Sequence, residues 1–252
     1  MSNPTIALQL YTVRDFATKD LPGTLSQVKA MGYDAVELAG TYGLETADFK
    51  KLLDETGLKA ISAHVPITAF EKDAAGTAAM YKALGCKLVS VPSLPDAALP
   101  GGEGFETTKA TMAKAAACCK ELGMKFGYHN HDYEFKTLPC GSFKLDALFD
   151  AMETVLAQID VGWVAAAGQD PVPYVQKYAG RCPSIHLKDI VMPGGKVEDR
   201  PVGQGSLDVP AIMKAAADVG ADIIVVELDD AHGMTSLEAA RQSREYLKTL
   251  GH

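Results

Sequence analysis

The feature that most constrains the fold is a regular alternation of short strand-like segments with longer amphipathic helical segments. The stretches MGYDAVEL (31–38), LGCKLVSV (84–91), LGMKFGYH (122–129) and VGADIIVVEL (219–228) repeat one pattern. In each, a helix end and a glycine lead through a short turn into a strand, and glycine is a common helix stop. The repetition predicts a chain built from successive helix–strand units.

Eight strand segments are predicted, and a helical segment follows each of them. The strands are expected at 5–10, 35–38, 60–64, 87–91, 125–131, 157–160, 184–188 and 222–228. Eight such repeats in 252 residues are typical of a (β/α)8 barrel, the TIM barrel of the α/β class. The main rival is an open doubly wound sheet, whose nucleotide-binding form needs a GxGxxG motif that is absent after the first strand. We therefore predict one TIM-barrel domain over residues 1–252, because no linker interrupts the pattern.

The composition excludes several classes of function. A formal net charge of −8 disfavours a nucleic-acid partner. No apolar run reaches the roughly 18 residues needed to cross a bilayer, and the opening MSNPTIALQLY does not resemble a signal peptide. Five cysteines without a CxxC pair indicate reduced thiols. We expect a cytoplasmic protein with no membrane partner.

Chemically reactive side chains gather at the predicted carboxyl ends of the strands, where TIM barrels carry their active sites. This edge collects Glu37, His64, His129, His131, Glu134, Asp160, Trp163, His186, Lys188 and Glu227. The opposite strand ends carry the blander set Ala35, Ala60, Lys87, Ala157, Ser184 and Asp222. A carboxylate such as that of Glu227, after a buried strand, is costly unless it is paired, protonated or bound to a cation. One such residue could be structural, but the gathering predicts a functional site.

Two of these histidines stand two residues apart in KFGYHNHDYEF (125–135). The period of a strand puts His129 and His131 on one face and Asn130 on the other. Such a pair can chelate a metal ion. Imidazoles together with two carboxylates suit Mn, Co, Zn, Fe or Ni better than Mg or Ca. A cation of this kind polarises a carbonyl, so the cluster predicts proton transfer next to a carbonyl group.

The chain resembles the xylose isomerase-like TIM-barrel superfamily, in its sugar phosphate isomerase/epimerase branch, over nearly its whole length. The motifs that carry the resemblance are LQLYTVRD (8–15), MGYDAVEL (31–38), ISAHVP (61–66), YHNHDYEF (128–135), IDVGWV (159–164), IHLKD (185–189), VGQGSLDVPAI (202–212) and VVELD (225–229). The resemblance implies one divalent metal ion held by a Glu, Asp, His, Glu set. Asp160, His186 and Glu227 match the last three positions, and His129 stands where many members have the first Glu.

The resemblance also implies roles for the neighbouring residues. In the epimerases the two metal-binding glutamates act as paired bases, so here either His131 or Glu134 would have to work beside Glu227. The expected substrate or supporting contacts are Glu37, His64 and Lys188. Trp163 could stack on a sugar ring or only pack at the barrel mouth.

These features predict a metal-dependent isomerase or epimerase that acts on a small carbohydrate, a sugar or keto-sugar with or without a phosphate group. A lyase on the same scaffold, for inosose dehydration or elimination from a 3-keto-glycoside, is the alternative because the same enolisation begins both reactions. An endonuclease IV-like role is disfavoured by the net charge and by the presence of only six histidines. A sugar-binding barrel without a metal is disfavoured by the intact Asp160, His186 and Glu227.

Other features leave more than one interpretation open. The glycine-rich segment 192–208 either closes over the site or only shapes a turn before the next helix. Arg14, Arg181 and Arg200 are candidate phosphate contacts by charge alone. Members of the branch are often dimers or tetramers, so the resemblance is compatible with a homo-oligomer.

Overall fold

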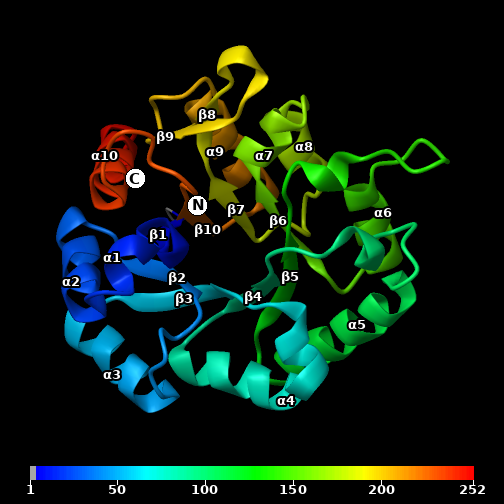
Figure 1. Ribbon diagram of the computed structural model, residues 1–252, viewed down its shortest axis with the longest axis horizontal. Helices are drawn as coiled ribbons and strands as arrows, with labels where there is room; N and C mark the ends of the chain where they lie inside the picture. The colour runs from blue at the N-terminus through cyan, green and yellow to red at the C-terminus, as the bar shows by residue number, and fades with distance from the viewer. Residues whose placement is uncertain (1–3) are drawn as a thin grey trace.

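Eight parallel strands close into a barrel in the computed structural model, which describes residues 4–252 (Figure 1). The barrel strands are β1 (Thr5–Gln9), β2 (Ala35–Ala39), β3 (Lys59–His64), β4 (Leu88–Val91), β5 (Lys125–His129), β6 (Leu156–Asp160), β7 (Ser184–Leu187) and β10 (Ile223–Val226). Their order around the barrel is β1-β10-β7-β6-β5-β4-β3-β2, so first and last strands are paired. The predicted TIM barrel is confirmed, and the open doubly wound sheet is excluded.

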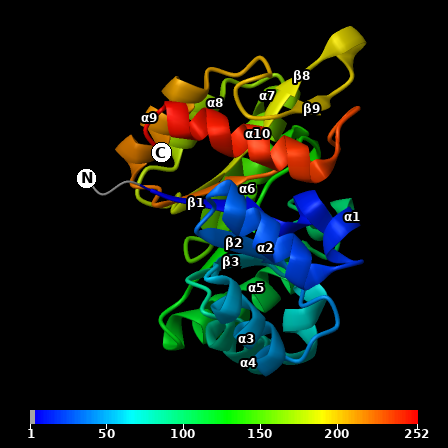
Figure 2. The same ribbon diagram turned by 90° about the vertical axis from the view of Figure 1, so that its left-hand side faces the viewer.

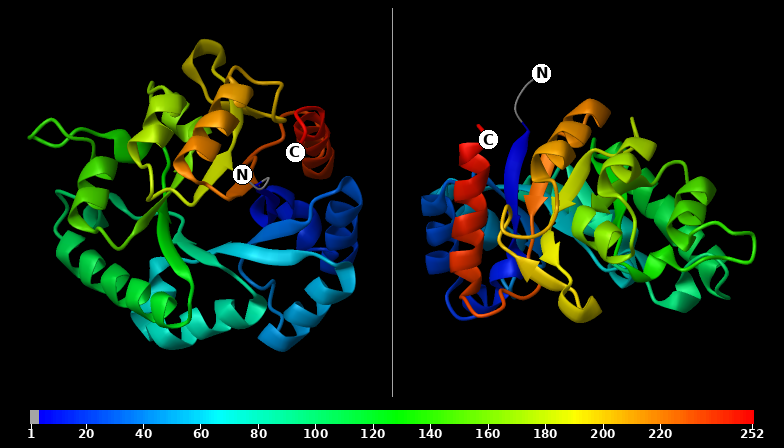
Figure 3. Two further views of the ribbon diagram at one scale, coloured as in Figure 1. Left: turned by 180° about the vertical axis from the view of Figure 1, so that it is seen from behind. Right: turned by 90° about the horizontal axis from the view of Figure 1, so that it is seen from above.

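A ring of helices surrounds the barrel, as the views from the two ends show (Figures 1 and 3). The helices are α1 (Arg14–Ala17), α2 (Leu21–Met31), α3 (Thr46–Thr56), α4 (Ile67–Leu84), α5 (Phe105–Glu121), α6 (Lys144–Ala151), α7 (Val161–Ala166), α8 (Pro171–Lys177), α9 (Val209–Val219) and α10 (Ser236–Thr249). Gly85 and Gly220 end α4 and α9 with φ of 104° and 83°, a left-handed conformation that favours glycine. The glycines predicted to end helices therefore do so because they adopt this left-handed conformation.

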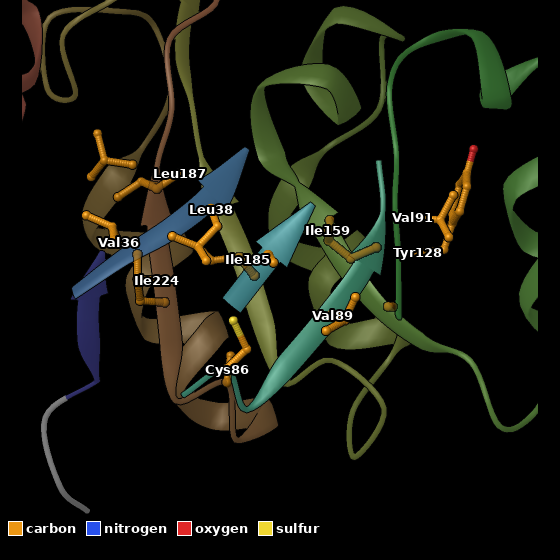
Figure 4. Packing of buried hydrophobic residues seen from close by; sticks show 14 of the residues in the cluster. Val36, Leu38, Cys86, Val89, Val91, Tyr128, Ile159, Ile185, Leu187 and Ile224 are labelled. Carbon is orange, nitrogen blue, oxygen red and sulfur yellow. The ribbon is translucent and has the colours of Figure 1, made fainter. Parts of the chain in front are cut away.

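The alternation of side chains along each strand separates the outer core from the barrel interior. Val36, Leu38, Val89, Ile185 and Ile224 belong to the outer core that the strands share with the helices (Figure 4). A separate apolar cluster, the apolar floor, fills the part of the barrel interior nearer the amino ends of the strands. It consists of Ala7, Ala35, Ile61, Leu88, Ile223 and Val225. Two residues after Ala7, Ala35 and Leu88, the same strands carry the buried polar side chains of Gln9, Glu37 and Ser90. The polar layer in the upper barrel, toward the carboxyl ends of the strands, thus rests on the apolar floor.

A short antiparallel arm follows β7. It consists of β8 (Asp189–Val191), β9 (Glu198–Arg200) and a 3-10 turn, η4 (Pro193–Gly195), and it projects from the barrel (Figures 2 and 3). The predicted loop over 192–208 is thus partly a hairpin. Two strands of three residues are too short to show a period, which is why the sequence pattern did not reveal them.

Two predicted barrel strands extend two residues beyond the observed strand ends. β5 ends at His129 instead of residue 131, because the His131 N–H bonds to the Glu134 carboxylate at 2.8 Å instead of continuing the ladder. β10 ends at Val226 instead of residue 228, because the Leu228 N–H bonds to Thr12 Oγ1 at 3.1 Å. In both cases a side chain takes over a backbone donor at the strand end.

Within residues 4–252, no helix is both long enough and apolar enough to cross a bilayer.

The apolar floor gives a direct test of the fold. Leu88→Ala should lower the free energy of unfolding by about 2–5 kcal/mol, because Leu88 is fully buried and a cavity would remain. The matched control is Leu44→Ala, whose side chain is 38% exposed and should cost about 0.5 kcal/mol or less. Urea unfolding of both variants checks this. Equal losses would contradict the assignment of Leu88 to a packed interior layer.

Candidate active site and metal centre

Four side chains from four neighbouring strands converge at the carboxyl end of the barrel. His129 ends β5, Asp160 ends β6, His186 lies on β7, and Glu227 follows β10 directly. Each offers one potential ligand atom, and these atoms all lie within 4.8 Å of one another. All four residues are buried. The structure therefore brings together the four residues that the sequence nominated as metal ligands.

The polar atoms of this group fit a single divalent cation. Asp160 Oδ2 and His129 Nδ1 are buried without a hydrogen-bond partner in the described residues, whereas Asp160 Oδ1 accepts the Trp163 N–H at 2.9 Å. A buried polar atom without a partner is costly. Two imidazoles and two carboxylates are donors that suit a transition-metal dication. A cation bound through Asp160 Oδ2 and His129 Nδ1 would give both of these atoms a partner.

Glu37, on β2, orients the imidazole of His186. Its Oε1 lies 2.7 Å from His186 Nε2 and accepts from Gln9 Nε2 at 2.7 Å, and its Oε2 accepts from Gln158 Nε2 at 2.7 Å. Burial alone would raise the pKa of Glu37, but His64 and His186 outweigh it and bring the pKa to about 2. The ionised carboxylate holds His186 Nε2–H as a donor, which directs Nδ1 toward Glu227. A metal-binding histidine is commonly held in this way.

His186 lies between two carboxylates. Its Nδ1 is 2.9 Å from Glu227 Oε2, while Nε2 contacts Glu37. Burial lowers the pKa of His186, but Glu37 and Glu227 more than compensate and raise it to about 10. Without a cation, a protonated imidazole therefore bridges the two carboxylates. Burial also raises the pKa of Asp160 to about 7, against the opposing effect of Lys188.

Lys188 is fully buried among carboxylates. Its Nζ lies 2.5 Å from Asp229 Oδ2, 3.6 Å from Glu227 Oε2 and 4.0 Å from Asp199 Oδ2. Burial raises the pKa of Glu227, but Lys188 and His186 lower this pKa by a larger amount. The carboxyl group of Glu227 is therefore ionised. A Cβ at Gly162 would come within 2.8 Å of the Lys188 side chain, so only glycine leaves space for it. Lys188, predicted as a substrate or supporting contact, is not in the lining of the cavity described below and lies within this carboxylate cluster.

A cavity of about 520 Å³ opens above the four converging side chains. It is lined by Tyr11, Ala39, Gly40, His64, Pro66, Pro92, Ser93, His129, His131, Glu227 and Asp229. Of the other predicted site residues, Glu37, Glu134, Asp160, Trp163, His186 and Lys188 are not in this lining. A larger cavity of about 800 Å³ lies at the opposite strand ends, around Thr5, Lys59 and Lys87. We assign the chemistry to the smaller cavity, because the potential ligands line it or lie directly beneath it.

The two predicted second acid/base candidates have separate locations. His131 lines the cavity, and its Nδ1 is buried without a partner in the described residues. Glu134 lies in the 3-10 helix η3 (Tyr133–Phe135), where Oε1 accepts from the Tyr128 hydroxyl at 2.6 Å and Oε2 from the His131 N–H at 2.8 Å. Both oxygens of Glu134 are thus used to hold the segment that carries His131.

Three residues with structural importance for the site were not nominated from the sequence. Gln158 bonds to Glu37 and lies 3.0 Å from His64 Nε2 through its Oε1. Asn130 Oδ1 accepts the Asp160 N–H at 3.0 Å, and Asp199 contacts the loop after β10. Gln158 could have been found from its spacing, because it lies two residues before Asp160 on one strand. Asp199 had no such signal, since its location depends on the arm.

A closed eight-stranded parallel barrel, with its buried polar side chains gathered at the carboxyl ends of the strands, defines a TIM-barrel protein. The model of the xylose isomerase-like TIM barrel family matches residues 25–250, and the chain belongs to this family. The resemblance predicted from the sequence motifs is thereby confirmed.

Individual relatives agree with this assignment. The chain is 24% identical to an inosose dehydratase from Clostridium perfringens, over 89% of this chain and 88% of the relative. A sugar phosphate isomerase/epimerase from Parabacteroides distasonis ATCC 8503 has a similar structure, with a TM-score of 0.81, 26% identity and 98% coverage of both chains. The IOLI protein with a bound zinc atom shares the fold, with a TM-score of 0.73, 15% identity and coverage of 98% and 97%.

Metal binding at this site should depend strongly on pH. A cation that binds His186 Nδ1 must displace a proton, because the pKa of about 10 keeps this imidazole protonated at neutral pH. Affinity for Zn²⁺ should therefore rise about tenfold per pH unit for each proton released, from about pH 7 to about pH 9. Calorimetry in buffers of different ionisation enthalpy counts the protons.

Glu37→Gln is the control for this pH dependence. It removes a carboxylate that raises the pKa of His186, so fewer protons should be released and the slope should become shallower. A Zn²⁺ affinity that does not change with pH in the unsubstituted protein would contradict the proton-bridged state of His186.

Proposed function

We propose that the protein is a metal-dependent sugar or keto-sugar isomerase or epimerase that transfers a proton next to a carbonyl group. The observation that carries the proposal is the convergence of four potential ligand atoms within 4.8 Å at the base of a 520 Å³ cavity. His129, Asp160, His186 and Glu227 would hold one divalent cation. The cation would polarise the substrate carbonyl and make the adjacent C–H bond more acidic.

Glu227 is suited to accept the proton on one side of the substrate. It lines the cavity, and Lys188 at 3.6 Å and His186 at 2.9 Å keep its carboxylate ionised. Its pKa lies below the usual range, despite a burial effect in the opposite direction. This carboxylate is therefore available as a general base at neutral pH.

His131 is suited to serve on the other side of the substrate. It follows β5, which is separated from β10 by β6 and β7 in the barrel wall. Burial lowers its pKa, with Glu227 acting in the opposite direction, so the imidazole is neutral at pH 7 and can accept a proton. We assign the second acid/base role to His131 instead of Glu134, because both oxygens of Glu134 are hydrogen-bonded outside the cavity.

The remaining predicted residues support this chemistry in different ways. His64 lines the cavity and could contact a substrate oxygen, since its Nε2 is fixed 3.0 Å from Gln158 Oε1. The Trp163 ring lies 5.5 Å from the His131 ring and would hold that imidazole in place. Glu37 and Lys188 would act through His186 and Glu227. The apolar floor shields this layer from water on the lower side.

A lyase or dehydratase is the second candidate function. It is favoured by the similarity to inosose dehydratase along nearly the whole of both chains. The first step would be the same, with loss of a proton to Glu227. The two reactions differ in the second step, because elimination breaks a C–O bond and the departing hydroxyl leaves as water after it gains a proton.

Substitution of His131 tests the proposed mechanism. In His131→Gln the metal ion should remain bound, because His131 is not one of the four candidate ligands. Conversion of the substrate to product should slow by about 10²–10⁴-fold with the loss of one of the two acid/base groups, whereas incorporation of solvent deuterium through Glu227 should continue. NMR in D₂O with metal-loaded protein and a panel of ketoses and keto-inositols measures both rates.

His252→Gln is the matched control, since His252 lines the opposite cavity and should leave the rate unchanged. The mass of the product separates the two functions, because loss of one water identifies a lyase. Conversion of the substrate to product at the wild-type rate in His131→Gln would contradict its acid/base role. The absence of exchange with every compound of the panel would contradict the enolisation chemistry.

A further inference from the structure

The charged side chains that line the cavity are acidic. Apart from its histidines, the lining contains two ionisable carboxylates, Glu227 and Asp229, and it contains neither lysine nor arginine. Lys188 lies nearby but is 0% exposed, with its ammonium group in contact with these two carboxylates. A substrate in the cavity therefore meets carboxylate oxygens without meeting a free cationic side chain of the described residues.

The arginines that were candidates for phosphate binding are otherwise engaged. Arg14 Nη1 donates to the Tyr11 carbonyl at 2.7 Å and Nη2 donates to the Asp229 carbonyl at 2.8 Å, with the guanidinium stacked 3.9 Å from the Tyr11 ring centroid. Arg181 donates to three backbone carbonyls near the end of α6. Arg200 pairs with its neighbour Glu198 at 2.6 Å on β9. None of these arginines lines the cavity.

Asp229 is fixed at the cavity wall by three separate elements. Its Oδ2 contacts Lys188 Nζ at 2.5 Å, after β7. Its backbone N–H donates to Asp199 Oδ2 of the arm at 2.5 Å, and its carbonyl accepts from Arg14 of α1. The side chain remains 38% exposed. A carboxylate held in this way presents a fixed acceptor and a fixed negative charge to the cavity.

A bound cation would not reverse the sign of the local charge. The carboxylates around the site carry five negative charges, on Glu37, Asp160, Asp199, Glu227 and Asp229. One divalent cation, the Lys188 ammonium and the Arg14 guanidinium next to Asp229 supply four positive charges, so one net negative charge remains. Because the polar layer lies in a water-poor interior, this charge acts more strongly than it would in bulk water.

We infer that Asp229 is a specificity-determining residue, which accepts a hydrogen bond from a substrate hydroxyl and repels anionic substrates. The site then takes neutral polyhydroxylated carbonyl compounds and discriminates against their phosphate esters. This inference rests on the proposed function and specifies its substrate class. The inference also assigns a role to the β8–β9 arm, because Asp199 of the arm accepts a hydrogen bond from the backbone N–H of Asp229 and fixes its position.

Paired ligands test the inference. The metal-loaded protein is titrated at low salt with D-fructose and D-fructose 6-phosphate, and with D-ribulose and D-ribulose 5-phosphate, by ligand-observed NMR. We expect each neutral compound to bind at least about tenfold more tightly than its ester. Asp229→Asn should bring this ratio close to one, by weakening the neutral compound and strengthening the ester. Added salt should reduce the ratio in the unsubstituted protein.

Asp230→Asn is the matched control, because Asp230 is exposed on the same loop and does not line the cavity. Its ratio should equal that of the unsubstituted protein. Esters that bind as tightly as the neutral compounds, or a ratio unchanged in Asp229→Asn, would overturn the inference and leave the proposed function standing. If Arg14→Ala then abolished ester binding, the phosphate would be located at Arg14. Failure of every sugar to bind or react would overturn the proposed function and this inference with it.

Discussion

The burial of ionised groups inside the upper barrel is the constraint on which the rest of the structure depends. Each buried charge costs several kcal/mol unless partners compensate it. The structure meets this cost with a connected network, in which His186 joins Glu37 to Glu227 and Lys188 joins Glu227 to Asp229. Removing one partner would leave another buried charge uncompensated, so the network has to form as a unit.

The same network prepares the site for chemistry. Thr12, Arg14 and Asp199 hold the backbone of the loop after β10, so that Glu227 and Asp229 have fixed positions before any ligand binds. Fixed donors and charges need no reorganisation when charge develops on a substrate, which is the main way in which enzymes stabilise transition states. The apolar floor below and the arm beside the site therefore serve one purpose, although they are far apart in sequence.

The barrel and the gathering of reactive side chains at one end of it could be predicted from the sequence, because the signals are local and repeated. Glycine marks the helix ends, and the carboxyl ends of barrel strands carry the active site, so Asp160 and His186 are expected to lie together. The partners of these residues could not be predicted in the same way. That Glu134 turns away to bind Tyr128, and that Asp199 reaches the loop of Asp229, depends on side chains folding back over turns. Such contacts leave no periodic pattern.

The most direct test of the central claim is the metal content of the protein, measured by mass spectrometry after purification without a histidine tag and after reconstitution. We predict about one divalent ion per chain, since the four ligand atoms form a single cluster. His129→Ala should lose the ion, and His131→Ala, the matched change two residues away, should retain it. An unsubstituted protein that binds no ion, or a His129→Ala variant that binds it as tightly, would contradict the assignment of these residues as a metal centre.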